Sequence, residues 1–160
     1  MIVQLKQSVP DTLQKEYTKQ LLHLKKNKQY VVLGVSLDKF RVVNEGGNPT
    51  LFLRVLFDIV DDCIDNDWVI KTGKYNEKYP DEFDTGIYMS PKEFKTPGFY
   101  FQYLFDYDPK TVNIFLEYIT KHNIISVADL AYAPKFRKEY YKILLKKIDD
   151  YCPVCLPPPF

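Results

Sequence analysis

The chain has 160 residues, of which 46% are hydrophobic and 16% aromatic; this excludes a disordered chain and predicts one domain, residues 1–160, with a sizeable core. Its formal net charge is only +1, so no global field draws it to nucleic acid, and no apolar run approaches the ~20 residues that cross a membrane. No apolar stretch precedes a small-residue cleavage site near the start, and the three cysteines are an odd number, so we expect no signal peptide and a cytoplasmic protein with reduced thiols.

The first part of the chain predicts a short strand followed by an amphipathic helix. Residues 1–7 alternate weakly between apolar and polar, which is typical of a short edge strand. Ser8 is a common N-cap residue and Asp11 lies in the first turn, so we expect a helix that runs to about Asn27. An apolar stripe at helical spacing supports this helix. The stripe consists of Leu13, Tyr17, Leu21 and Leu24.

Two strands and a strong turn should follow. Residues 30–37 form a continuous apolar run that predicts a buried strand, and residues 40–43 return as its partner after a turn at Asp38 and Lys39. Residues 46–49 contain two glycines and a proline, which is typical of a tight turn. A phosphate-binding loop would need a third glycine or a following Lys-Ser/Thr, and neither is present.

The next apolar run allows two interpretations. Phe52, Leu56, Ile59 and Cys63 recur at helical spacing, which favours a short helix over residues 55–63, and a strand is the alternative. Residues 68–71 predict a strand that begins with Trp68, which we expect to lie mostly in the core. Residues 74–86 predict an exposed loop, and residues 86–89 a last strand.

Helical signals replace strand signals after residue 89. Ser90 and Thr96 each precede a proline, and Asp108 before Pro109 begins a clear helix that should end near Asn123. Shorter helices are expected from residues 126 and 134, before an extended tail over residues 152–160. Together these elements predict an α+β fold, with a small antiparallel sheet over residues 30–89 packed by the N-terminal helix and a helical C-terminal third.

Charged residues are grouped along the chain. Residues 1–43 and residues 132–148 each carry a net charge of +5, whereas residues 58–84 carry nine acidic residues against three lysines. Opposed patches of this kind predict either a recognition surface or ordinary solvated faces.

No group of side chains has the pattern of a catalytic or metal site. A calcium loop starting at Asp61 would need an oxygen ligand, a glycine and an acid where the chain has Cys63, Asn66 and Thr72. No second carboxylate pair or nearby histidine supports acid–base catalysis by the acidic run. The Cys-Pro-Val-Cys sequence over residues 152–155 has redox or zinc spacing, but it follows a helix and lacks two further ligands. We therefore expect no catalytic residues, no cofactor and no metal.

The central stretch resembles a family of small bacterial immunity proteins encoded beside polymorphic toxins, of the contact-dependent inhibition type. The resemblance covers residues 29–122 and lies in a strand pair, a Gly-Pro turn, an acidic Leu-Phe segment, a Trp-Val strand, a Pro-Gly-Phe segment and an Asp-Pro helix. The matching residues are 30–33, 40–44, Gly47, Pro49, 56–61, Trp68, Val69, 97–99 and 106–109.

The resemblance implies a protein without chemistry of its own that binds a cognate toxin domain and blocks it. If that toxin is a nuclease, its substrate cleft is basic, and acidic and aromatic side chains of this chain should occupy it. The expected partner-binding residues are Asp58, Asp61, Asp62, Asp65, Asp67, Tyr75, Tyr79, Asp81, Glu82, Phe83 and Asp84.

An accessory nucleic-acid-binding protein is the alternative function. It would use the basic helices over residues 15–28 and 135–147, where tyrosines and phenylalanines are interleaved with lysines. The near-neutral charge and the absence of a recognition motif make this alternative the weaker one. The sequence leaves the toxin's identity and the oligomeric state open.

Overall fold

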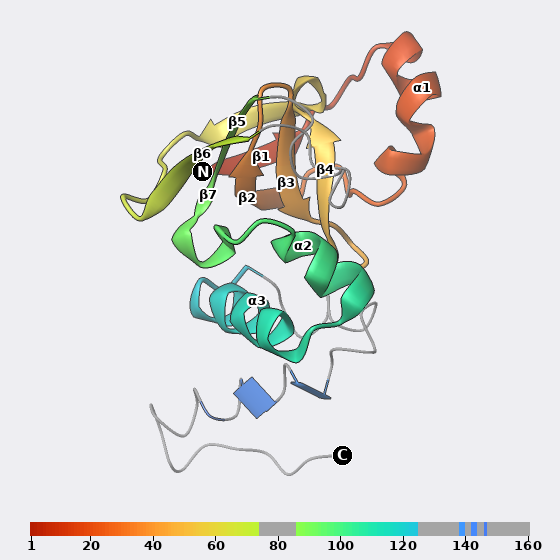
Figure 1. The fold of residues 1–160 in the computed structure, drawn as a ribbon. Coiled ribbons are helices and arrows are strands. Elements are labelled where there is room, and N and C mark those ends of the chain that lie inside the picture. Colours follow the sequence, from red (N-terminus) through yellow and green to blue (C-terminus); the bar gives the residue numbers. More distant parts are fainter. Residues whose placement is uncertain (74–85, 125–137, 140–141, 144–145, 147–160) are drawn as a thin grey trace.

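Figure 1 shows the computed structural model, which describes residues 1–73, 86–124, 138–139, 142–143 and 146. Its main layer is a seven-stranded antiparallel sheet, and helices α2 (Phe99–Phe101) and α3 (Pro109–Lys121) lie on one side of it. The expected α+β fold is confirmed. The strands are β1 (Ile2–Leu5), β2 (Gln29–Val35), β3 (Lys39–Val43), β4 (Pro49–Leu53), β5 (Phe57–Asp61), β6 (Trp68–Gly73) and β7 (Gly86–Pro91).

Strand β2 is the centre of the sheet because it pairs with three other strands. Along one edge it pairs with β3, and along the other edge it pairs first with β1, opposite residues 29–31, and then with β7, opposite Val35. Strand β5 pairs with β1, and β6 pairs with β7. The outermost row on this side therefore consists of β5, the connecting residues 62–67 and β6.

Alternate residues of β2 enter two different hydrophobic clusters, so this strand is buried on both faces. Leu33 packs with side chains of α2 and α3, whereas Tyr30 and Val32 pack in the second cluster. In the second cluster the Phe57 ring lies 6.2 Å from Phe40 and 6.3 Å from Phe52, in edge-to-face contacts that join β5 to β3 and β4. The sheet is therefore curled around this cluster.

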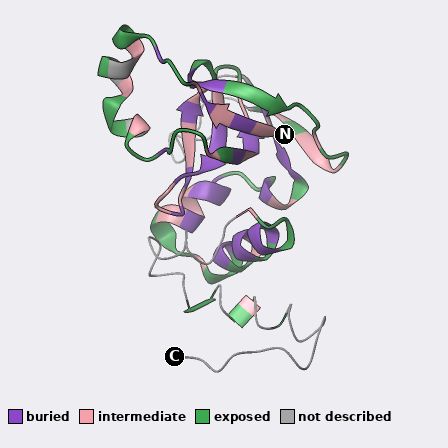
Figure 2. Cartoon of the chain, turned by 180° about the vertical axis from the view of Figure 1, so that it is seen from behind, coloured by how far each residue is buried: buried purple, intermediate pink, exposed green. Residues whose placement is uncertain are grey.

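Helix α3 follows the sequence signals closely. The Asp108 side chain accepts a hydrogen bond from the backbone N–H of Thr111 at 2.8 Å, and Pro109 opens the first turn. The expected apolar face is buried, and Asn123 ends the segment with a φ of 52°. Figure 2 shows the buried residues of α3 toward the sheet. None of the helices in the described ranges is long and apolar enough to cross a membrane.

Helix α1 (Asp11–Leu21) is shorter than expected, and it projects from one end of the sheet (Figure 1). The chain leaves the helix after Leu21 because Leu24 turns into the second cluster and the Lys25 N–H donates to the Tyr30 hydroxyl at 2.6 Å. Leu13 and Leu21 are only partly buried against that cluster. The helix thus covers the sheet over a small area.

The helix expected over residues 55–63 is wrong, and the alternative strand is right. Residues 54–56 form a single 3-10 turn, and β5 follows it as a strand paired with β1. Phe52 and Leu56 are both buried because the turn redirects the chain between them. Two buried residues four positions apart therefore have the spacing of a helix although the chain is not helical here.

Two smaller expectations also differ from the structure. Strand β1 lies between β2 and β5, so it is an interior strand and not an edge strand. Ser90 lies inside β7, one residue before its end, and is fully buried. The helix expected from this residue is a 3-10 turn (Lys92–Phe94) without a side-chain cap. The helices expected from residues 126 and 134 and the tail over residues 152–160 lie outside the described ranges, apart from isolated positions.

Candidate functional site

The acidic segment, residues 57–67, forms the exposed part of the outer row of the sheet. Phe57 is buried, but the next four residues of β5 are all exposed, including Ile59 at 50% and Val60 at 49%. Figure 2 shows this exposed strand from behind. Both faces of β5 beyond Phe57 are therefore open to solvent, and they present apolar and acidic side chains together.

Residues 62–67 connect β5 to β6 at the place where β7 ends and β1 begins. The Met1 ammonium donates to the Cys63 carbonyl, and the Cys63 N–H donates to an Asp61 carboxylate oxygen at 2.9 Å. The Trp68 N–H donates to the Asp65 carbonyl at 3.1 Å. These backbone contacts hold the connection against the sheet and leave the side chains of Asp62 and Asp65 exposed.

Little of the acidic charge is neutralised by the described part of the protein. Asp67 forms an ion pair of 3.8 Å with Lys92, and no ion pair among the described residues involves Asp58, Asp62 or Asp65. The Asp61 pKa is lowered, chiefly because the Cys63 backbone N–H donates to its carboxylate, so this group keeps its charge. The segment therefore presents a row of carboxylates to solvent.

The acidic connection also approaches helix α3. The Tyr118 pKa is raised, first by burial and then by the negative charges of Asp65, Asp67 and Glu93. The Tyr118 ring in turn makes an edge-to-face contact with Phe94, with centroids 4.6 Å apart. Part of the acidic segment therefore lies close enough to the helical layer for its charge to act on Tyr118.

Asp61, Asp62 and Cys63 bring donor atoms within 4.8 Å of one another, as a metal site would. All three residues are exposed, and a hydrogen bond to Asp61 raises the pKa of the Cys63 thiol. Metal binding through cysteine requires the thiolate. The arrangement therefore favours a carboxylate surface over a metal centre.

Comparisons of the chain with protein-family models, with curated proteins and with solved structures gave no match.

The structure places five of the expected partner-binding residues together and leaves the others undescribed. Asp58, Asp61, Asp62 and Asp65 are exposed and Asp67 is half-buried, all within the acidic segment. Tyr75, Tyr79, Asp81, Glu82, Phe83 and Asp84 lie outside the described residues.

The sequence interpretation missed the apolar side of this site. Ile59 and Val60 were expected on a helix, yet they lie exposed on an edge strand beside Asp58 and Asp61. The adjacent β-branched pair was the available signal, since such residues favour strands.

Trp68 is less buried than expected. It packs against the second cluster as a half-buried residue, because β6 lies at the outer edge of the sheet. Its indole N–H is buried and has no hydrogen-bond partner among the described residues. Truncating Trp68 should therefore cost less stability than truncating a fully buried ring.

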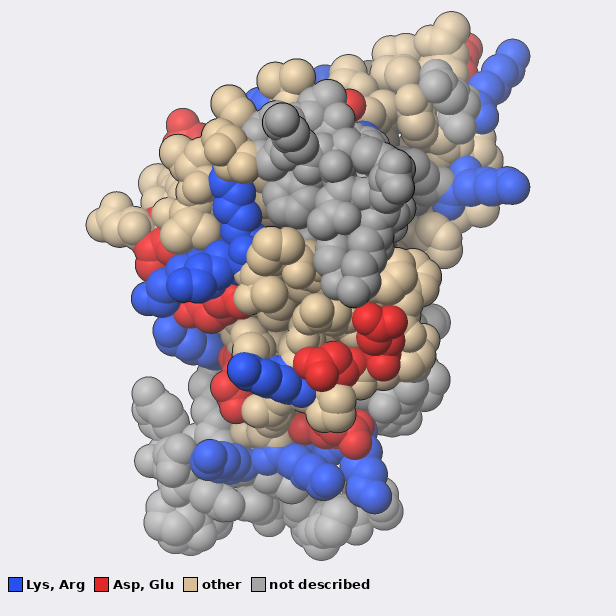
Figure 3. All heavy atoms as spheres, in the orientation of Figure 1, with Lys and Arg blue, Asp and Glu red and all other residues tan. Residues whose placement is uncertain are grey.

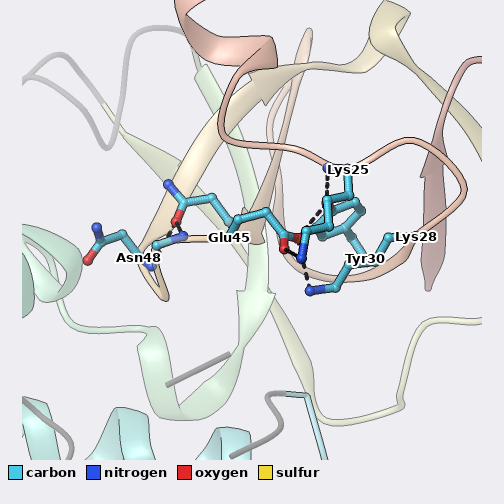
Figure 4. Close-up of polar contacts among 7 residues, drawn as sticks. Lys25, Lys28, Tyr30, Glu45 and Asn48 are labelled. Carbon is cyan, nitrogen blue, oxygen red and sulfur yellow. Dashed lines mark hydrogen bonds and ion pairs between the residues drawn. The ribbon is translucent and has the colours of Figure 1, made fainter. Parts of the chain in front are cut away.

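The basic N-terminal stretch is partly neutralised within the fold. Figure 4 shows Glu45 between Lys25 and Lys28, with N–O distances of 2.9 Å to both, while the Tyr30 hydroxyl donates to Glu45 at 2.8 Å. The face seen in Figure 3 carries both lysines or arginines and acidic residues, and neither sign covers it alone. These contacts weigh against a basic nucleic-acid surface at residues 15–28.

The Glu45 contacts lead to a pH prediction. Burial raises the Glu45 pKa, but hydrogen bonds from Lys28, Lys25 and Tyr30 outweigh it, so the pKa is lowered from 4.5. Because the folded pKa is depressed, the carboxylate stabilises the fold above pH 4.5, and this contribution is lost as the pH falls through the folded pKa. Glu45→Gln should reduce the free energy of unfolding by about 1 kcal/mol at pH 7.

Urea unfolding of wild type and Glu45→Gln at pH 7, 5 and 3 tests this prediction. The difference between the two proteins should shrink toward pH 3, whereas the exposed acid in Glu117→Gln serves as a control with little effect at any pH. A difference that stays constant with pH would show that the charge of Glu45 does not matter.

Proposed function

We propose that this protein is an immunity protein that binds a cognate bacterial toxin domain in the cytoplasm and blocks it by direct contact. The observation that carries the proposal is the acidic segment, where exposed carboxylates flank exposed Ile59 and Val60 on an edge strand. The family resemblance of residues 29–122 is the second support. No chemistry of the chain itself is needed for this function.

The acidic segment has the composition expected of a recognition surface. Ile59 and Val60 supply apolar area that a partner can cover, and Asp58, Asp62 and Asp65 supply charge without ion pairs among the described residues. Complementary charge mainly accelerates association, and apolar contacts at the centre slow dissociation. A toxin with a basic substrate cleft, such as a nuclease, fits this surface because the carboxylates replace the phosphates of its substrate.

Co-expression tests the function as a whole. The protein encoded by the adjacent gene is produced in a host with and without this chain, and growth is measured. We expect growth only when this chain is present, together with a stable complex of the two proteins. Equal growth in both cultures, or poisoning in both, would refute an immunity function.

The aspartates should affect binding far more than folding. In the triple variant Asp58→Asn, Asp62→Asn and Asp65→Asn, we expect affinity for the toxin domain to fall about tenfold or more, mainly through slower association. The melting temperature should change by no more than about 2 °C, because exposed charges contribute little to stability.

A matched variant removes the same charge from elsewhere on the surface. Asp11→Asn, Asp38→Asn and Asp106→Asn replace three other exposed acids, and this protein should retain its affinity within about twofold. Surface plasmon resonance at two salt concentrations measures both association rates. Equal losses in the two triple variants would mean that net charge alone matters, and the acidic segment would not be the binding surface.

A further inference from the structure

The outer edge of β5 is open in the described part of the protein. Strand β5 ends the path β4-β3-β2-β1-β5, and no described strand pairs with its outer side. Ile59 and Val60 are half exposed, and Asp58 and Asp61 beside them are also exposed. An unpaired strand edge of this kind can pair with another chain.

The register shows which backbone groups of β5 face outward. The Lys6 N–H donates to the Leu56 carbonyl at 2.9 Å, so Gln4 and Asp58, two positions along, form the next hydrogen-bonded pair. Between them, Val3 and Ile59 form a non-hydrogen-bonded pair. The backbone N–H and C=O of Ile59 therefore point away from β1, toward solvent.

The same assignment follows independently from the other side of β1. The Val32 N–H donates to the Met1 carbonyl at 3.1 Å, and Val3 lies opposite Tyr30 in that ladder. By alternation, Val3 directs its N–H and C=O toward β2. Val3 therefore does not bond to Ile59, and no strand among the described residues pairs with the N–H and C=O of Ile59.

Charge disfavours pairing of this edge with a second copy of the chain. Two β5 edges would bring Asp58 and Asp61 of one copy close to the same residues of the other, and like charges on adjoining strands are destabilising. The register shift at Val60, where one extra residue interrupts the pairing with β1, also limits the length of the edge. The edge is therefore suited to a short strand of opposite charge.

We propose that the Ile59 edge of β5 accepts an extended, lysine- or arginine-bearing segment of the partner protein as an added strand. This inference rests on the proposed function and specifies how the toxin is held. The backbone of the added strand bonds to the N–H and C=O of Ile59, its basic side chains lie opposite Asp58 and Asp61, and its apolar side chains cover Ile59 and Val60.

Amide hydrogen exchange tests the added strand directly. The probe is a short synthetic peptide of alternating lysine and valine, added at millimolar concentration, and the control peptide replaces lysine with glutamate. The Ile59 amide should exchange about tenfold more slowly with saturating lysine peptide, whereas the Asp58 amide, already in the β1 ladder, should change little. The glutamate peptide should protect neither amide.

A substitution that removes a backbone hydrogen-bond donor provides a second test of strand addition. Ile59→Pro removes the outward N–H, fixes the local φ and removes apolar area, but it removes no hydrogen bond to β1. Ile59→Thr retains the N–H while removing similar apolar area. We expect Ile59→Pro to weaken binding of the lysine peptide about tenfold, and Ile59→Thr much less. If Ile59→Pro does not fold, the exchange measurement on the wild-type protein decides the question alone.

The outcomes separate this inference from the proposed function. Lack of Ile59 protection by saturating peptide, or peptide binding that Ile59→Pro leaves unchanged, would overturn strand addition. Neither result bears on toxin neutralisation, which the co-expression test decides. Growth protection combined with an unprotected Ile59 amide would leave a toxin-binding surface formed by side chains alone.

Discussion

Phe94→Ala should reduce the free energy of unfolding by about 3–5 kcal/mol, which is enough to unfold many small domains. The Phe94 side chain is 1% exposed, and its ring centroid lies 4.8 Å from Phe99, 5.8 Å from Phe115 and 4.6 Å from Tyr118. Truncation removes the buried ring and leaves a cavity that helices on one side and strands on the other cannot easily fill. Urea unfolding followed by circular dichroism measures the loss.

The matched control is Phe105→Ala. Phe105 is 57% exposed, and its ring centroid lies 4.9 Å from that of Phe101. Its truncation should cost less than about 1 kcal/mol. If both variants lost equal stability, the cluster around Phe94 would not be the structure that joins the helices to the sheet.

This first prediction also bears on the acidic segment. The Lys71 ammonium of β6 donates to the Phe94 carbonyl at 3.0 Å, and Lys92, two residues earlier, pairs with Asp67. Loss of the Phe94 ring should loosen the turn that carries both contacts. A partly folded Phe94 variant should therefore bind the proposed toxin partner more weakly, although Phe94 itself is buried and cannot contact it.

Local signals explain which elements the sequence predicted well. The Asp108 cap and Pro109 are adjacent residues that fix the start of α3, and the Asn44 side chain accepts from the Gly46 and Asn48 N–H groups within one turn. Gly47 in that turn has a φ of 76°, where glycine is favoured. Such features can be predicted from neighbouring residues alone, because they do not depend on contacts with distant parts of the chain.

The misassigned elements depend on distant partners. Strand β1 is interior because Val3 pairs with Tyr30 on one side and with Ile59 on the other. Residues 57–61 adopt a strand because β1 offers them a free edge, which overrides their helical spacing. No local pattern in residues 1–7 predicts that β1 pairs with β2 and with β5.

The candidate site likewise has one feature that the sequence predicts and one that depends on distant residues. Exposure of Asp58, Asp62 and Asp65 could be predicted, because acidic residues without partners are rarely buried. The open backbone edge at Ile59 could not, since it is defined by the position of β5 at the end of the strand order. The amino-acid composition was enough to predict an acidic segment, whereas the open strand edge on which its aspartates lie follows only from the strand order of the sheet.

Gly34→Ala should reduce the free energy of unfolding by about 3 kcal/mol, the upper part of the range for overpacking. An added Cβ at residue 34 would lie 2.0 Å from the Tyr88 Oη and 2.6 Å from Cζ of its ring. Tyr88 is 6% exposed and belongs to β7, which pairs with β2 only around Val35. The ring cannot withdraw without disturbing this narrow contact between the β6–β7 hairpin and the rest of the sheet.

A double-mutant cycle with Tyr88→Leu identifies the cause of that loss. Tyr88→Leu alone should be destabilising because it removes a buried ring, yet adding Gly34→Ala to it should cost little, since the shorter side chain leaves room for the new methyl group. The two substitutions should therefore be strongly non-additive in urea unfolding. If Gly34→Ala cost as much in the Tyr88→Leu background as in wild type, the close approach of Tyr88 would not be the reason for glycine at this position, and the extended backbone of β2 itself would have to require it.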